Sequence, residues 1–506
     1  MDAEAAVATP ERGRLAGFDL RMWIEELRRL GELSVVQGAD ADLEVGAITD
    51  LNAKIHGPAL LFVDIGGHEG QGQLLTCTLS RAARLASALG FDPGIDDQAL
   101  VEELRGRPRQ WREAAPRFEP VVVTDAPMFQ NRLSGTEIDM RRFPAPLWHE
   151  GDGGRYLGTG GSMITRDPET GIVNCGTYRI CVHDERRLGV CIEPYNHGAI
   201  HLQKYRERGE PCPVAITFGH GPLVYIASSM PLPYGVCELN VMGAMAEAPI
   251  DVIEGELTGL PIPASSELVI EGWINPGDVD FEGPFGEFTG YFAGGREKNP
   301  VIQVERVYFR DDPIVYGSLT GKPPFDHSYW RCAIESSMLV DELADAGIPD
   351  VKGAWKHEAG SANFFTVVAI KQRYAGHAQQ VGVASALVAG GASMGRYVVV
   401  VDEDVDVMDL DEVVWCLSTR TDPARSIQVL RDTPTNPIDP MLEDAEASWT
   451  GSRAVINACR PFHRLDTFSK VVSVSPELAQ RVRAQWGRQL GWPMTTADMS
   501  RSDEPS

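Results

Sequence analysis

The chain has 506 residues, of which 43% are hydrophobic and 23% are charged. This is an ordinary globular balance that allows two or three domains with substantial cores. The formal net charge of -26 gives a surface that repels phosphate backbones and anionic lipid, so nucleic acid and membrane are not expected as partners. An anionic substrate would have to be drawn in by a local basic group.

The first segment, residues 1–120, is predicted to be a small α/β domain. Asp19 can cap a helix whose leucines and isoleucine recur at helical spacing, and Gly31 ends it. A strand-like apolar run at 59–65 and a helical stretch around 79–89 follow.

Residues 121–325 have a different texture, in which short β-branched runs alternate with glycine and proline turns. Many short strands with frequent turn signals predict a barrel or a sandwich. The predicted strands are residues 121–124, 162–165, 175–182, 188–192, 214–218, 268–271 and 301–309.

The third segment, residues 326–470, begins with a predicted helix at 329–346. Strand, helix, strand and helix patterns then follow, which is the βαβ arrangement of a parallel sheet. In residues 471–506, Ser475-Pro-Glu begins a terminal helix that runs towards Leu490 and is suited to docking on a neighbouring subunit.

Nine cysteines are scattered along the chain without a C-x-x-C pair. This pattern argues against a disulfide framework or a cysteine zinc site and for reduced thiols. No apolar run approaches the ~18–20 residues of a membrane span, and the N-terminus lacks the basic start of a signal peptide. We therefore expect a cytoplasmic protein.

Two apparent nucleotide or metal motifs are rejected. The run from Gly158 resembles a dinucleotide fingerprint, but Met163 stands where the third glycine is needed. The acidic run from Asp402 starts like a calcium loop, but Val407 replaces the glycine that makes its sharp turn.

Two glutamates bracket a tight turn in the string Phe281-Glu-Gly-Pro-Phe-Gly-Glu-Phe-Thr-Gly-Tyr291. Glu282 and Glu287 are therefore expected to emerge on one side of a loop. Two close carboxylates give one protonated acid and one ionised base near neutral pH, which suits proton delivery to carbon. The alternative is a turn with two solvated acids.

A second candidate group comes from Asn174-Cys-Gly-Thr-Tyr-Arg179, Glu193-Pro-Tyr-Asn-His197 and Cys237-Glu238. Arg179 is the natural clamp for a substrate carboxylate, although a surface ion pair is the alternative. In one continuous strand, Asn174 and Arg179 would face opposite sides unless a bulge intervenes. Asn174, His197 and Glu238 offer ligands that suit Mg²⁺ or Mn²⁺ more than Zn²⁺, but nothing in the spacing shows that they converge, and for each alone a structural role is the better interpretation.

Together these patches resemble the signatures of the UbiD-type decarboxylases, which depend on prenylated flavin, and the resemblance covers essentially the whole chain. It rests on the glutamate string and the residues in register with it. It also rests on Arg155-Tyr-Leu-Gly-Thr-Gly-Gly, Ile164-Thr-Arg-Asp-Pro-Glu-Thr-Gly171 and the run from Arg396 to Asp406.

The resemblance implies an α/β (α+β overall) protein with three domains and a terminal helix. These would be an N-terminal α/β domain, a central split β-barrel that binds flavin, and a C-terminal α/β parallel-sheet domain for oligomerisation. It also implies a homodimer or a homohexamer, and a flavin prenyltransferase as the supplier of prenylated FMN.

The resemblance further implies roles for individual residues. Arg179, Glu282 and Glu287 would be catalytic, with Arg179 holding the substrate carboxylate and Glu287 supplying the proton. Many family members carry Asp at the position of Glu287, so its reach differs here. The implied binding sets are Asn174, His197 and Glu238 for Mn²⁺ (or Mg²⁺), Ala227, Ser228, Met230 and Glu238 for K⁺, and Asn174, Thr177, Arg179, Asn196, His197, Ser228, Ser229, Glu238 and Arg396 for the cofactor.

The implied activity is reversible, non-oxidative decarboxylation of an aromatic, heteroaromatic or α,β-unsaturated acid, for example phenazine-1-carboxylate. Two alternatives remain from the sequence. One is a conventional flavin-dependent reductase or oxidase, and the other is a non-catalytic flavin-binding partner subunit.

Overall fold

The computed structural model describes residues 18–492 except for these gaps: 69–70, 195, 293–294, 389–393 and 443–448. The chain divides into two units, Met1–Cys459 and Arg460–Ser506. The segment boundaries expected at residues 120, 325 and 470 remain predictions. No helix in the described part of the chain combines the length and the apolar character that a membrane crossing requires.

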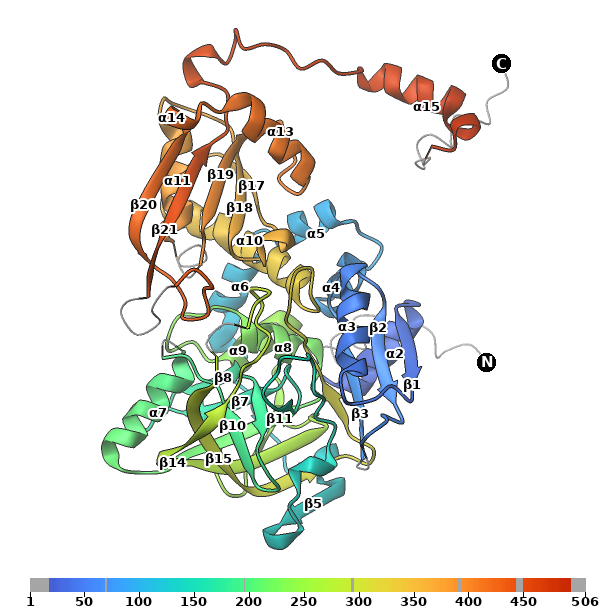
Figure 1. Cartoon of the computed structure of the whole chain (residues 1–506), viewed down its shortest axis with the longest axis vertical. Coiled ribbons are helices and arrows are strands. Elements are labelled where there is room, and N and C mark those ends of the chain that lie inside the picture. Colours follow the sequence, from blue (N-terminus) through green and yellow to red (C-terminus); the bar gives the residue numbers. More distant parts are fainter. Residues whose placement is uncertain are drawn as a thin grey trace. The chain divides into compact units, whose positions relative to one another are not determined.

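The N-terminal helix forms where the cap and spacing predict it. In α2 (Leu20–Arg29) the Asp19 carboxylate accepts a hydrogen bond from the Met22 amide at 3.0 Å, and the apolar face is buried. Beside it lies a four-stranded sheet in the order β1-β2-β3-β16, shown in blue and yellow in Figure 1. Its strands are β1 (Leu33–Gln37), β2 (Ala59–Val63), β3 (Gln73–Thr76) and β16 (Ile314–Tyr316).

Four further helices belong to this region: α3 (Glu44–Lys54), α4 (Ala82–Ala88), α5 (Asp97–Leu104) and α6 (Arg107–Ala114). Because β16 comes from beyond residue 300, the N-terminal sheet is completed only by a strand that follows the central segment.

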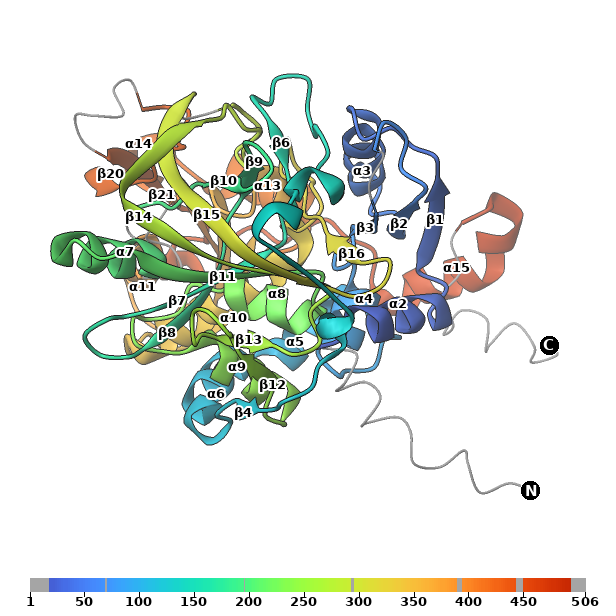
Figure 2. The same ribbon diagram turned by 90° about the horizontal axis from the view of Figure 1, so that it is seen from below.

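The central segment is a curled sheet in the order β6-β9-β10-β15-β14-β11-β7-β8, with β5 paired to β15. Figure 2 shows the two longest strands, β14 and β15, sweeping across this sheet. The strands are β5 (Asn131–Ser134), β6 (Arg155–Tyr156), β7 (Ser162–Arg166), β8 (Val173–Thr177), β9 (Ile180–Val182), β10 (Arg187–Val190), β11 (Cys212–Phe218), β14 (Leu268–Glu282) and β15 (Glu297–Phe309). The predicted split barrel is thereby confirmed.

Both faces of this sheet are buried, as the alternating residues of β11 show. Ala215 packs in the hydrophobic cluster that includes the neighbouring helices, whereas Val214 and Ile216 pack in the hydrophobic cluster inside the curled sheet. Three helices that the sequence pattern did not predict cover the segment: α7 (His197–Arg208), α8 (Pro222–Ser229) and α9 (Glu238–Ala246). A small sheet of β4 (Val121–Val122), β12 (Asp251–Glu254) and β13 (Pro261–Pro263) lies beside them.

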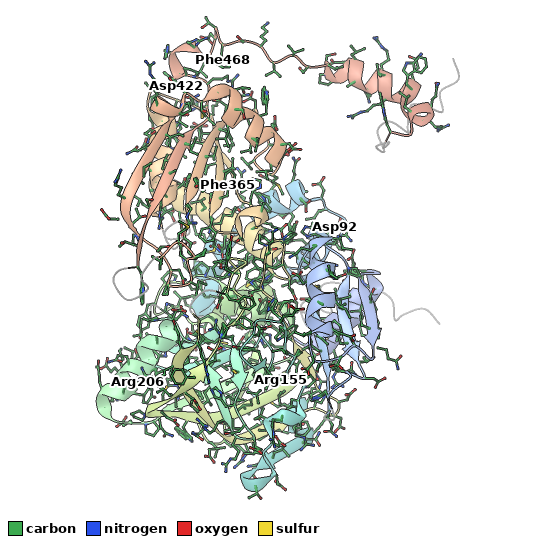
Figure 3. All side chains as sticks on the ribbon, viewed as in Figure 1. Asp92, Arg155, Arg206, Phe365, Asp422 and Phe468 are labelled. Atoms are coloured by element: carbon green, nitrogen blue, oxygen red, sulfur yellow. The ribbon has the colours of Figure 1, made fainter. Side chains whose placement is uncertain are left out.

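The C-terminal sheet has the order β17-β18-β19-β21-β20. Its three inner strands pair in parallel, as the βαβ pattern predicts, and both edge strands pair antiparallel. Figure 3 labels Phe365 at the start of β18 and Arg155 on the central sheet. The elements are α10 (Ser328–Asp345), β17 (Val351–Lys356), β18 (Phe365–Ile370), α11 (His377–Leu387), β19 (Tyr397–Asp402), α13 (Leu410–Arg420), α14 (Pro423–Ser426), β20 (Ile427–Pro434) and β21 (Thr450–Asn457).

The unit Arg460–Ser506 contains α15 (Pro476–Leu490). The Ser475 hydroxyl caps this helix by accepting a hydrogen bond from the Leu478 amide at 3.2 Å, as the Ser-Pro-Glu signal predicts.

Candidate active site

A cavity of about 530 Å³ opens between the central sheet and the C-terminal segment. Ten of the predicted site residues line it: Asn174, Thr177, Arg179, Asn196, His197, Ser228, Ser229, Met230, Glu238 and Glu287. Asn363, Met394 and Ile438 of the C-terminal segment complete the wall. The cavity is therefore built from elements far apart in the sequence.

Arg179 reaches this cavity because the predicted strand 175–182 is broken. The structure contains β8 and β9 instead: β8 is the last strand of the curled sheet, and β9 is the second strand from its other end. The two-residue link Tyr178–Arg179 joins them. Asn174 and Arg179 therefore line the same cavity, and the expectation that they face opposite sides holds only for an unbroken strand.

Arg179 contacts both glutamates of the predicted pair. Its Nε and Nη2 donate to the two oxygens of Glu282 at 2.9 and 3.0 Å, and its Nη1 donates to Oε1 of Glu287. The guanidinium also lies over the Phe285 ring, 5.2 Å from its centroid. A guanidinium has five N–H groups, so two remain for another acceptor.

The two glutamates have different surroundings. Glu282, at the end of β14, also accepts from the Tyr156 hydroxyl at 2.6 Å and from Asn299 Nδ2 at 2.8 Å, so four hydrogen bonds fix the position of its two oxygens. Glu287 has Arg179 as its side-chain partner. Burial, opposed by Arg179, raises the pKa of Glu287 to about 7. Glu282 is thus anchored by four donors, while Glu287 carries an exchangeable proton near neutral pH.

Arg179 stays charged in this arrangement. Burial opposes its charge, but the adjacent carboxylates of Glu287 and Glu282 raise the pKa of the guanidinium well above its ordinary value. A permanent cation at the cavity wall is the local basic group that an acidic protein needs to attract a carboxylate.

The three predicted metal ligands converge on another part of the wall. His197 Nδ1 lies 3.7 Å from Oε1 of Glu238, whose Oε2 accepts from the Cys175 amide at 2.8 Å. Asn174 also lies close to this pair. A Cβ atom placed on Gly198, the residue after His197, would be 3.7 Å from Nδ2 of Asn174. In the described part of the chain, no three His, Cys, Asp or Glu side chains gather as a metal site. The set here has two such side chains and one amide.

His197 and Glu238 are the first residues of α7 and α9. Helix N-termini present free amides and favour anions, so a phosphate fits beside this oxygen and imidazole set together with a divalent ion. The residues present therefore fit a phosphorylated cofactor held with a hard metal ion.

Hydroxyl groups extend the polar wall next to this set. Thr177 Oγ1 lies 2.9 Å from the hydroxyls of both Ser228 and Ser229, and Ser228 also donates to the Tyr225 carbonyl at 3.1 Å. These oxygens are ligands of the type that a monovalent cation takes.

Three predicted site residues lie outside the cavity lining: Ala227, Glu282 and Arg396. Ala227 is buried in α8, where its carbonyl accepts from the Met230 amide at 3.3 Å. Arg396 pairs with both oxygens of Asp439 at 2.6 and 2.7 Å and stacks on Phe364. The structure therefore gives Arg396 a partner away from the other cofactor residues.

Sequence reasoning missed several contacts of the cluster. Tyr156 lies in a motif that carried the family resemblance, but no signal linked it to a glutamate 126 residues away. Asn299 on β15 and the stacked Phe285 had no distinguishing pattern either. Burial also raises the pKa of the neighbouring Glu193. Asn299 could have been identified only from the strand pairing, since the register of β14 and β15 places it near Glu282.

Comparison with known proteins covers almost the whole chain. Residues 24–106, 121–323 and 328–458 match the N-terminal, Rift-related and C-terminal domains of the 3-octaprenyl-4-hydroxybenzoate carboxy-lyase (UbiD) family. The chain is 32% identical over 493 residues to pyrrole-2-carboxylic acid decarboxylase of Pseudomonas aeruginosa, covering 93% of this chain and 98% of that protein. It is 31% identical to phenolic acid decarboxylase of Bacillus subtilis, covering 96% and 98%.

Solved structures show the same fold. Vanillic acid decarboxylase of Sedimentibacter hydroxybenzoicus in its closed form is 28% identical with a TM-score of 0.79, covering 94% of this chain and 98% of that one. The UbiD-class enzyme HmfF of Pelotomaculum thermopropionicum in complex with FMN is 26% identical with a TM-score of 0.79, covering 91% and 98%. An evolved dimeric form of HmfF was solved with prFMN. With this fold, the matched domains and a relative 32% identical across nearly its full length, the chain belongs to the UbiD family of carboxy-lyases.

Proposed function

We propose that this carboxy-lyase catalyses the reversible, non-oxidative decarboxylation of an aromatic, heteroaromatic or α,β-unsaturated carboxylic acid with prenylated FMN as its cofactor. The observation that carries the proposal is the Arg179–Glu282–Glu287 cluster at the cavity wall. Relatives named as decarboxylases of pyrrole-2-carboxylic, phenolic and vanillic acids support the acid class. The HmfF complexes with FMN and prFMN support the cofactor.

Arg179 binds the substrate carboxylate through the two N–H groups that the glutamates leave free. Glu282 fixes the guanidinium plane, since its bidentate contact is reinforced by Tyr156 and Asn299. Glu287 holds a proton near neutral pH and delivers it to the carbon that loses the carboxylate. Bound prenylated FMN would supply the electron sink for that carbon.

Asn174, His197 and Glu238 would hold Mn²⁺ or Mg²⁺ against the cofactor phosphate, and Ser228, Met230 and the Ala227 carbonyl would contribute to a K⁺ site. Thr177, Asn196 and Ser229 would contact the cofactor from the same wall. Apart from Ala227, the residues assigned here line one cavity, and this convergence supports the assignments together with the anion preference of the α7 and α9 N-termini.

A flavin prenyltransferase would supply the cofactor in the cytoplasm, and the working protein would be a homodimer or a homohexamer. A dimeric HmfF form supports the smaller assembly for that relative.

The test is to co-express the chain with a flavin prenyltransferase and purify it without oxygen. The mass of the released cofactor is then measured by mass spectrometry, and aromatic acids are screened for CO₂ release. We expect a prenylated FMN mass and turnover of at least one acid. Glu287→Gln should retain the cofactor and lose CO₂ release. Plain flavin with NAD(P)H-dependent turnover would favour a reductase, and cofactor binding without any turnover would favour a partner subunit.

A further inference from the structure

A short segment, residues 149–153, packs against the loop that carries Glu287. Its sequence is His149-Glu-Gly-Asp-Gly153, and it lies just before β6. The loop comprises residues 283–291, between β14 and β15, and is called the acid loop below. No residue of the segment lines the cavity or belongs to the predicted catalytic, cofactor or metal sets. The segment can therefore act on the reaction only through the acid loop.

The segment and the acid loop touch closely. A Cβ atom placed on Gly153 would lie 2.0 Å from the carbonyl oxygen of Gly283, and one placed on Gly286 would lie 2.7 Å from Nδ1 of His149. A side chain at either position would displace its neighbour, so glycine is required at both for this close approach. The Gly153 amide also donates to the Pro284 carbonyl at 2.7 Å. These contacts hold the acid loop at a fixed distance from the segment.

Asp152 binds the residue directly before Glu287. Its side chain is fully buried, and Oδ1 accepts a hydrogen bond from the Gly286 amide at 3.0 Å. The Thr320 hydroxyl donates to the carbonyl of the same glycine. The amide of Glu287 itself donates to the Tyr291 carbonyl at 3.0 Å, inside the acid loop. Asp152 is thus an anchor that fixes the backbone next to Glu287 from outside the loop.

His149 holds the Asp152 carboxylate in place. The His149 amide donates to Oδ2 of Asp152 at 2.9 Å, and Nδ1 of the ring lies 3.2 Å from the same oxygen. Because a carboxylate only accepts hydrogen bonds, the ring carries a proton on Nδ1. In the described part of the chain, no lysine or arginine pairs with Asp152. A buried carboxylate without such a partner depends on its hydrogen bonds, so the two residues act as a pair.

The same histidine also supports Arg179. The His149 ring meets the Phe285 ring edge to face, with 6.3 Å between the centroids. The Arg179 guanidinium lies over Phe285, 5.2 Å from its centroid. Asp152 therefore fixes the residue before Glu287, while His149 supports the ring next to Arg179. The pair bears on both partners of the Arg179–Glu287 contact.

We propose that Asp152 and His149 are positioning residues that hold Glu287 against Arg179, where it delivers its proton to the carbon that loses the carboxylate. This inference rests on the proposed decarboxylation. Neither side chain touches the substrate, and each acts through a neighbour of the reacting groups. Proton delivery requires the acid within hydrogen-bond reach of the carbon, and a shift of about 1 Å can cost roughly 100-fold in rate.

The first test measures kcat and KM of the loaded enzyme with the aromatic acid that the CO₂ screen identifies. Asp152→Ala removes the contacts to both backbone amides and should lower kcat by roughly 100-fold while KM and bound flavin stay at wild-type values. Asp152→Asn keeps an acceptor for the Gly286 amide and should recover part of kcat. His149→Phe keeps a ring against Phe285 without the bond from Nδ1, so its kcat should lie between the wild type and Asp152→Ala.

The second test follows Glu287 in the cofactor-free chain. Burial raises the pKa of Glu287 from 4.5 to about 7. The stability gained by Glu287→Gln should therefore grow between these two pH values. If Asp152 keeps the acid loop in place, Glu287→Gln should show little of this growth when it is added to Asp152→Ala. General destabilisation affects both chains of such a pair equally and leaves the growth unchanged.

Asp19→Ala is the matched control. Asp19 also accepts a hydrogen bond from a backbone amide at 3.0 Å, that of Met22, but it caps α2 and, among the described residues, does not contact the acid loop. The variant should lose stability while kcat, KM and the growth with pH stay at wild-type values.

Wild-type kcat in Asp152→Ala would overturn the inference, as would a loss of kcat that only follows a loss of bound flavin. Undiminished growth with pH in the Asp152→Ala background would also overturn it. If Asp152→Ala does not fold, Asp152→Asn and His149→Phe carry both tests. If no acid is decarboxylated, the proposed function fails, and the unfolding measurements still decide whether Asp152 holds Glu287 in place.

Discussion

Replacing Glu287 with glutamine should change how the stability of the cofactor-free chain depends on pH. The pKa of Glu287 is raised from 4.5 to about 7, mainly by burial. Between these two values the folded chain keeps a proton that the unfolded chain has lost, so wild-type stability falls as pH rises. Each unit of pKa shift corresponds to about 1.36 kcal/mol. The free energy of unfolding of the wild type should therefore fall by about 3 kcal/mol, and the fall is complete above pH 7.

Glutamine keeps the shape of the side chain and never ionises, so Glu287→Gln escapes this loss. The free energy of unfolding of the variant minus that of the wild type should rise by about 3 kcal/mol between pH 4.5 and 7 and then stay level. Chemical unfolding of both chains at a series of pH values measures it, and the subtraction cancels the other titrating groups. The exposed Glu210→Gln is the control and should show a level difference.

A difference that does not change with pH would refute the reasoning, because it would mean that folding does not raise the pKa of Glu287, so that the side chain holds no proton to deliver near neutral pH. A fall instead of a rise would mean that Arg179 outweighs burial and lowers the pKa of Glu287.

Three further predictions concern the same cavity. Glu282→Gln should destabilise the chain by about 3–5 kcal/mol in thermal or chemical unfolding, because it removes the buried carboxylate that pairs with Arg179 through two hydrogen bonds. A loss below about 1 kcal/mol would contradict the anchoring role. Tyr156→Phe removes one hydrogen-bond donor to Glu282, so the free energy of unfolding should fall by about 1–3 kcal/mol while FMN still binds. Loss of FMN binding would contradict this, because it would give the tyrosine a role in holding the cofactor. His197→Ala should lose manganese and most flavin together, measured by elemental analysis and absorbance; full occupancy of both would exclude the Asn174–His197–Glu238 set.

Local signals in the sequence were sufficient for elements whose cause is local. Asp19 capped α2, and Ser475 capped α15, as predicted. The βαβ pattern also gave the parallel centre of the C-terminal sheet. The antiparallel edge strands depended on pairing partners, which no local pattern encodes.

Elements with mixed signals were predicted less well. Strand β14 continues to Glu282, although residues 275–277, Asn-Pro-Gly, read as a turn; the structure accommodates them as an irregularity in the pairing with β15. Helices α7, α8 and α9 were missed because glycine, proline and serine within or before them read as turns.

The candidate site was predicted by residue type and not by geometry. A tight turn was enough to bring Glu282 and Glu287 together, but only the break between β8 and β9 brings Arg179 to them.

The link between β8 and β9 also affects how the chain reaches its active form. The contact of Arg179 with Glu282 joins residues 103 apart in the sequence, and the contact of Tyr156 with Glu282 joins residues 126 apart. Contacts so distant in sequence form late, because the entropy of closing such loops is lost before any contact compensates for it. A chain still emerging from the ribosome, shorter than residue 282, has neither Glu282 nor Glu287 to pair with Arg179. Catalytic competence should thus appear only when the curled sheet is complete, and refolding assays that follow activity would report the last step of folding.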